Sequence, residues 1–278
     1  MRHADFHAGS PGAGARNSLR SLLTALASGA IIGALGGLIG LGGAEFRLPL
    51  LLAVFGFVAL EAVILNKAIS LIVVVSALAF RSTAVPFADV LAQWPVLMNL
   101  LAGSLAGAWF GADFATRISA RALHGIIAML LIAIALVLAF AHDPVSPASP
   151  IAQGTLLIAI GVVAGLIIGV VASLLGVAGG EFLIPTLVLF FGIDIKLAGS
   201  LSLAISLPTM LVGLARYSRD QSFAVVRANS RFAIVMAARS IAGAYFGTRL
   251  LTVVPVTVMV PMLAAILVVS AIKIWRHR

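Results

Sequence analysis

The fold of this chain is decided by the stretch Gly40-Leu41-Gly42-Gly43-Ala44-Glu45-Phe46-Arg47-Leu48-Pro49-Leu50, because the chain contains it twice. A copy lies 136 residues later and reads Gly176-Val177-Ala178-Gly179-Gly180-Glu181-Phe182-Leu183-Ile184-Pro185-Thr186. Between residues 33–56 and 169–192, ten of twenty-four positions are identical without a gap. At the same offset, the Gly-Ala-x-Phe-Gly segment 107–111 matches 243–247. The chain is therefore an internal duplication.

The composition around this stretch is that of a membrane protein. The 278 residues are 62% hydrophobic and 10% charged, whereas soluble domains are about 25% charged. Uncharged runs cover residues 22–44, 90–112, 151–180 and 250–272. Each run exceeds the ~20 residues that a helix needs to cross the ~30 Å hydrocarbon core of a bilayer. The sequence predicts an all-α polytopic membrane protein.

The charge pattern predicts where the ends of the chain lie. The net charge of +9 comes from basic residues in tails and short loops beside apolar spans, a pattern that indicates the cytoplasmic side rather than nucleic-acid binding. We expect a disordered cytoplasmic tail at 1–18, transmembrane repeats at 19–141 and 151–278, and a Pro-rich linker at 142–150. The predicted location is the cell inner membrane, with both termini cytoplasmic. Cysteine is absent, which excludes a thiolate metal site, and we predict neither metal nor cofactor.

Each repeat offers about five apolar segments, and an odd number turns the second repeat upside down relative to the first. The expected segments are 19–41, 46–59, 62–80, 90–112 and 122–141, then 151–176, 182–193, 197–215, 230–251 and 253–274. The loop after the third segment carries one arginine in the first repeat but four in the second, over residues 216–231. Equivalent loops should therefore face opposite sides of the membrane, as in an inverted repeat.

The second segment of each repeat is too short to span the bilayer. Its 12 to 14 residues reach only ~18–21 Å, and each copy follows a glycine-rich break at Gly43 or Gly179 and contains an early proline. Short, interrupted segments at matching positions of inverted repeats predict a binding site near the midplane. The free N–H groups at the starts of such half-helices favour an anion.

These residues resemble the sulfite exporter TauE/SafE family, also called the 4-toluene sulfonate uptake permease family. The resemblance is carried by the repeated stretch and by Gly199-Ser200-Leu201-Ser202-Leu203-Ala204. Through the duplication it extends over nearly the whole chain after the tail. The family pattern has a Gly triplet, which here reads Gly-Gly-Ala and Ala-Gly-Gly and is followed by Glu. The resemblance implies a carrier of sulfite, sulfonates or related organosulfur anions.

Glu45 and Glu181 are equivalent, and a carboxylate at membrane depth is costly unless it is paired, hydrated or protonated. One interpretation is proton coupling or gating beside the site. The other is that each carboxylate caps backbone N–H groups freed at the glycine break. Arg47, two residues after Glu45, is expected to form a local ion pair.

Hydroxyl and amide groups suited to sulfonyl oxygens occur on the third segment of each repeat. Asn66 and Ser70 share one helix face, and the second repeat offers Ser200, Ser202 and Ser206. These side chains could equally join neighbouring helices by hydrogen bonds. Lys67 is a candidate anion ligand, although its long side chain could instead reach the membrane interface.

Arg239 lies about nine residues from either end of its segment, too deep for its side chain to reach water easily. We expect it to face the bundle interior and to bind an oxyanion through its planar donors. The alternative is a structural ion pair with Glu45 or Glu181.

Two other functions remain open from the sequence. A passive anion channel differs little in sequence from a carrier. An intramembrane enzyme would need a catalytic motif, and no Gly-x-Ser-x-Gly or His-Glu-x-x-His motif occurs. We therefore predict a secondary transporter without catalytic residues, and the sequence leaves a homo-oligomer open.

Overall fold

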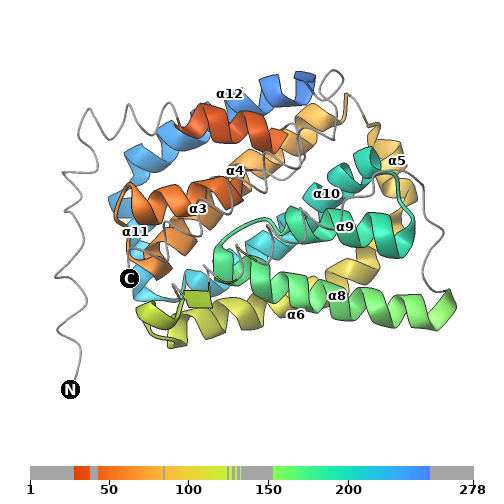
Figure 1. The fold of residues 1–278 in the computed structure, drawn as a ribbon, viewed down its shortest axis with the longest axis horizontal. Coiled ribbons are helices and arrows are strands. Elements are labelled where there is room, and N and C mark those ends of the chain that lie inside the picture. The colour runs from red at the N-terminus through yellow and green to blue at the C-terminus, as the bar shows by residue number, and fades with distance from the viewer. Residues whose placement is uncertain are drawn as a thin grey trace.

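The computed structural model describes residues 28–37, 43–83, 85–123, 125–126, 129, 132 and 153–250. Over these residues the chain is a bundle of helices (Figure 1). The first repeat contributes a helix at Ser28–Gly37, α3 (Ala44–Ala53), α4 (Ala59–Arg81), α5 (Phe87–Ala92) and α6 (Trp94–Arg117). The second contributes α8 (Gly154–Leu175), α9 (Gly180–Phe191), α10 (Ile195–Tyr217), η1 (Gln221–Phe223), α11 (Ala224–Ala228) and α12 (Ser230–Leu250).

Four of these helices are long and apolar enough to cross a membrane: α4, α6, α8 and the Lys196–Tyr217 part of α10. The prediction of an all-α, multi-pass membrane protein is confirmed at this level. The expected fifth segments, 122–141 and 253–274, fall almost entirely outside the described residues, as do the 1–18 tail and the 142–150 linker.

The two short helices begin at the glycine breaks. Gly43 and Gly179 precede α3 and α9 with φ angles of 73° and 84°, values that glycine adopts without a steric penalty. With 10 and 12 residues, α3 and α9 rise only ~15–18 Å, so neither spans a bilayer. Both begin two residues earlier than the sequence predicted, because Ala44 and Gly180 already have helical geometry.

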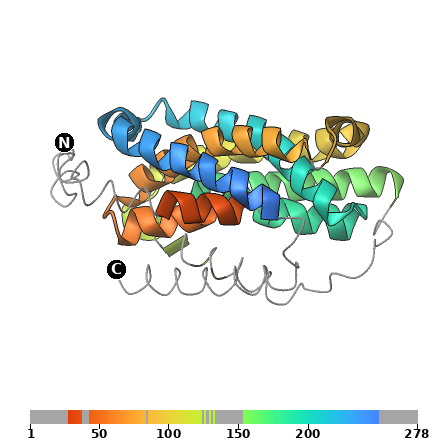
Figure 2. The same ribbon diagram turned by 90° about the horizontal axis from the view of Figure 1, so that it is seen from above.

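The duplication reappears in the way the helices pack. Gly33, on the first helix of repeat one, lies against the backbone of Ser240 in α12. At the equivalent positions, Gly169 of α8 lies against the backbone of Ser104 in α6. The first helix of each repeat thus packs on the helix that forms the fourth predicted segment of the other repeat, α12 or α6 (Figures 1 and 2). A Cβ on either glycine would overlap the facing carbonyl oxygen, and such close approach is how small residues hold membrane helices together.

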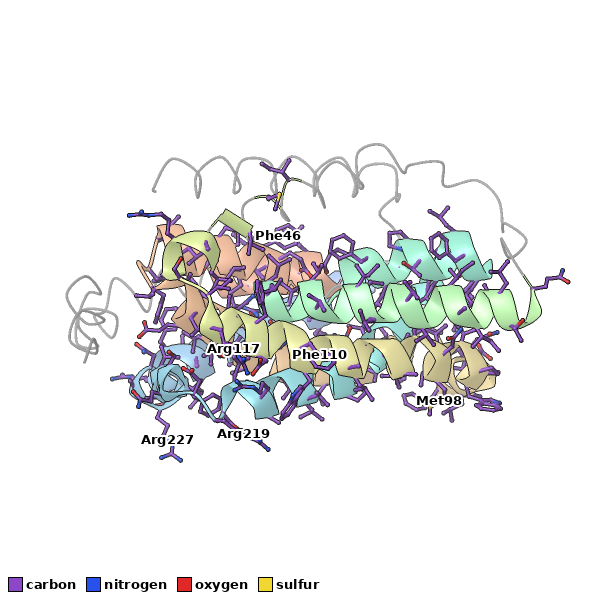
Figure 3. All side chains as sticks on the ribbon, turned by 90° about the horizontal axis from the view of Figure 1, so that it is seen from below. Phe46, Met98, Phe110, Arg117, Arg219 and Arg227 are labelled. Carbon is purple, nitrogen blue, oxygen red and sulfur yellow. The ribbon has the colours of Figure 1, made fainter. Side chains whose placement is uncertain are left out.

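The ends of the molecule differ in charge. The α4–α6 connection with α5 and the α10–α12 connection with α11 lie at opposite ends of the bundle (Figures 1 and 2). Arg117, Arg219 and Arg227 gather at the α11 end, whereas Met98 lies at the other (Figure 3). At the arginine-rich end, Asp113 of α6 accepts hydrogen bonds from Arg216 of α10 and forms a salt bridge with Arg117. These contacts tie α6 to α10.

Candidate functional site

The two short helices meet at their N-terminal turns, in the interior of the bundle. Glu45 and Glu181 are 1% and 2% exposed, and their carboxyl groups are close enough to interact electrostatically. None of the four carboxyl oxygens has a hydrogen-bond partner among the described residues. Two neighbouring carboxyl groups in an apolar interior repel each other when both are charged, and a proton on one of them removes this repulsion. The pair can therefore hold a proton.

Arg47 places a guanidinium close to this carboxyl pair. The residue is fully buried, and its Nη1 donates to Ser70 Oγ at 2.7 Å and to Asn66 Oδ1 at 3.4 Å. Its Nη2 donates to Ser240 Oγ at 3.3 Å. Its Nε has no partner among the described residues, and within that part of the chain Arg47 forms no salt bridge. Within the described residues, the hydrogen bonds of this cation all go to neutral oxygens.

The expected ion pair between Arg47 and Glu45 is therefore wrong. Glu45 is near enough to Arg47 to attract it electrostatically, yet the guanidinium turns to α4 and α12 instead. Positions 45 and 47 of a helix point about 200° apart around the axis, so the side chains leave α3 in nearly opposite directions. The carboxyl group faces Glu181 and the guanidinium faces Asn66 and Ser70.

Asn66 and Ser70 come together as predicted, one turn apart on α4. Asn66 also fixes the start of α3, because its Nδ2 donates to the carbonyl oxygen of Ala44 at 3.0 Å. The cluster of Arg47, Asn66, Ser70 and Ser240, called here the arginine cluster, joins three helices around one positive charge.

The serines of the second repeat do not join this cluster. Ser206 donates to the carbonyl oxygen of Ala178 at 2.6 Å, and Ser202 to that of Gly199 at 2.9 Å. Ser200 instead accepts a hydrogen bond from Arg81 Nε at 3.3 Å. The contact of Ser206 joins α10 to the chain before α9, which fits the alternative interpretation, whereas the bond from Ser202 to Gly199 stays within α10.

Lys67 is fully buried rather than extended to an interface. Its Nζ donates to Ser173 Oγ of α8 at 3.2 Å and lies over Gly213 of α10, whose missing side chain leaves the space. Lys67 therefore points to the α8–α10 side of α4, away from the partners of Arg47.

The expectation that Arg239 faces the bundle interior is wrong. Arg239 is exposed, and the buried residue at that level of α12 is its neighbour Ser240. Gly29 of the first helix packs against the Cβ of Arg239, so the close helix contact turns the guanidinium outward. Arg47 supplies the buried guanidinium instead. Sequence reasoning missed Arg47 and Ser240, although one signal was present: Arg47 is a charge where the copy has Leu183.

The site is rich in hydrogen-bond donors that suit an anion. A guanidinium with an unpaired N–H, hydroxyl groups and half-helix N-termini are all donors, and the adjacent carboxyl pair can exchange a proton. Within the described residues, no group of three His, Asp or Glu side chains is arranged to hold a metal ion.

Comparison with known proteins adds one match. The family model of the sulfite exporter TauE/SafE matches residues 24–274, a range that contains both short helices and the whole arginine cluster. No curated protein and no solved structure matches the chain. Because the family model covers nearly the whole sequence, the chain belongs to the sulfite exporter TauE/SafE family of membrane transporters.

Proposed function

We propose that this protein is a secondary transporter of a small organosulfur or sulfur oxyanion, such as sulfite or a sulfonate, and that proton exchange at Glu45 and Glu181 couples to transport. The substrate binds at the arginine cluster, among α3, α4 and α12. Its negative charge is balanced by Arg47, while Asn66 and Ser70 orient its oxygens.

The observation that carries this proposal is the burial of Arg47 without a salt bridge to any of the described residues. A charge removed from water is costly unless an opposite charge accompanies it. The hydrogen bonds of Arg47 within the described residues go to neutral oxygens, and Glu45 acts on it only at longer range. A bound oxyanion would supply the missing charge and could accept a hydrogen bond from the unpaired Nε. The site thus gains stability when an anion arrives, as a binding site should.

The repeated packing of the helices supports an alternating-access mechanism. The first helix of each repeat packs against the other repeat, and equivalent loops lie at opposite ends of the bundle. An inverted repeat with these features can open to one side and then to the other around a fixed midplane site. In this proposal the arginine-rich α11 end faces the cytoplasm of the cell inner membrane, and both termini lie on that side. A homo-oligomer is compatible with this arrangement but is not required by it.

A passive anion channel is the second candidate, because a buried cation can attract an anion in a channel as well as in a carrier. Purified protein in liposomes separates the two. A carrier gives saturable sulfite uptake that depends on the pH gradient, whereas a channel gives an ohmic current under a voltage ramp. Arg47→Met should abolish carrier uptake, and Arg227→Gln, at an exposed arginine, should not. Uptake that Arg47→Met leaves unchanged would remove the arginine cluster from the proposal.

A further inference from the structure

A second buried guanidinium lies at the far end of α4 from the arginine cluster. Arg81 is 1% exposed. Its Nε donates to Ser200 Oγ at 3.3 Å, and its Nη2 donates to the carbonyl oxygen of Lys196 at 2.9 Å. Its Nη1 has no partner among the described residues.

No carboxylate of the described residues balances this charge, because none forms a salt bridge with Arg81. The acidic residue closest in sequence to Lys196 and Ser200 is Asp194, whose side chain is committed elsewhere. It caps α10 by accepting from the backbone N–H groups of Lys196 and Leu197 at 2.9 and 3.3 Å. Arg81 therefore has the same property as Arg47: a buried cation held by neutral oxygens, with one donor nitrogen left over.

Arg81 also lies on the same face of α4 as the arginine cluster. It follows Ser70 by eleven residues, which is ~16 Å along the helix and within about 20° of the same direction. Of the buried residues between them, Val74 and Ala77 belong to a small apolar cluster separate from the main core, whereas Val73 belongs to the main core. The other members of the small cluster are Ala178 on the chain before α9, and Leu203 and Met210 on α10. An apolar layer thus separates the two guanidinium groups.

We infer that Arg81 and Ser200 form a second anion subsite, where a sulfite-type oxyanion is held near one face of the membrane before it crosses the apolar layer to Arg47. This inference rests on the proposed function. The position equivalent to Arg81 in the second repeat is Tyr217, whose hydroxyl group donates to the carbonyl oxygen of Ser173 at 2.8 Å. The opposite end of the bundle therefore lacks an equivalent guanidinium, and the subsite serves one face only.

The test is the number of sulfite ions that the purified full chain binds, measured by equilibrium dialysis with radiolabelled sulfite. We expect two per chain in the wild type and one in Arg81→Gln, with the remaining Kd unchanged within about twofold. Ser200→Ala should weaken the second site by about tenfold, as expected for one lost hydrogen bond to a charged group. Arg227→Gln, at an exposed arginine, is the matched control and should keep both sites.

Other outcomes separate this inference from the proposed function. One sulfite per wild-type chain, lost in Arg47→Met, would overturn the second subsite and leave the proposed function standing. Two sulfites in a folded Arg81→Gln would overturn the subsite as well. If Arg81→Gln does not fold, unchanged binding at both sites in Ser200→Ala would have the same meaning. Absence of any sulfite binding by the wild type would contradict both proposals.

Discussion

Replacement of Arg47 by methionine should remove anion binding without unfolding the protein. The affinity for the anion should fall, whereas the stability of the fold should stay the same or rise. Met keeps the length of the side chain but neither the charge nor the donors. The equivalent position of the second repeat is already aliphatic: Leu183 is 2% exposed in the matching helix α9. The duplicated scaffold therefore tolerates an apolar side chain at this place.

The two magnitudes follow from the contacts of Arg47. The variant loses hydrogen bonds to Ser70 and Ser240 but no longer buries an uncompensated charge. Replacing buried charges by apolar side chains is often neutral or stabilising by about 1–4 kcal/mol. We therefore expect the stability to stay the same or to rise. In contrast, two charge-assisted hydrogen bonds to the oxyanion are lost, at about 1.5–3 kcal/mol each. The Kd for sulfite should then rise by about 10²–10⁴-fold.

The assay pairs two measurements on the same purified protein. Thermal unfolding is followed by the fluorescence of the three tryptophans, and sulfite binding by calorimetry. Leu183→Met is the matched control, because it places the same side chain at the equivalent position of the copy. A variant that unfolds several degrees lower and binds sulfite with an unchanged Kd would show that Arg47 is a scaffold residue and would refute this reasoning.

Three further predictions test the carboxyl pair, the packing of α8 on α6, and the orientation of equivalent loops relative to the membrane. Glu45→Gln and Glu181→Gln should each leave expression near normal but flatten the pH dependence of sulfite uptake, because the amide cannot carry the exchanged proton. Gly169→Val should destabilise the α6–α8 contact by about 1–3 kcal/mol, measured as a lower unfolding temperature, because its Cβ would meet α6 backbone atoms. Single cysteines at Ser82 and Ser222 should react with an impermeant thiol reagent from opposite sides of the membrane.

Each of these has a result that would contradict it. Unchanged pH profiles in both glutamine variants would leave the carboxylates only the role of capping the helix starts. Val163→Leu, on an exposed face of α8, is the packing control, and equal losses in the two α8 variants would show that the close backbone contact does not matter. Equal labelling of both cysteines from one side would remove the inverted arrangement.

The sequence was sufficient to predict the features that depend on pattern. The glycine breaks at Gly43 and Gly179 become the starts of α3 and α9, because a left-handed glycine and an early proline fix a helix start locally. Asn66 and Ser70 meet because residues four apart share a helix face. Predicting that these two residues share a helix face required no knowledge of the rest of the fold.

The residues that were misplaced depend on rotation of a helix about its axis, which the sequence constrains weakly in a membrane protein. Arg239 lies near the middle of α12, but Arg239 and Ser240 point about 100° apart, and helix packing decides which one is buried. The contact of Gly29 with α12 turns Ser240 inward. For a helix of a soluble protein, the position of the polar face would have shown which side is exposed and which is buried. On a helix surrounded by lipid and protein, both faces are apolar, and the hydrophobic pattern gives no direction.

The duplication also shows how a repeated scaffold can carry buried positive charge in one repeat only. The three buried cations of the described interior, Arg47, Lys67 and Arg81, all belong to the first repeat, and the equivalent residues are Leu183, Leu203 and Tyr217. The carboxyl pair, in contrast, takes one residue from each repeat. The helix packing and the carboxyl pair therefore follow the symmetry, while positive charge breaks it. In the proposed function, a carrier built this way rocks symmetrically between two states and still binds its anion along α4, where the first repeat alone supplies the buried positive charge of the described residues.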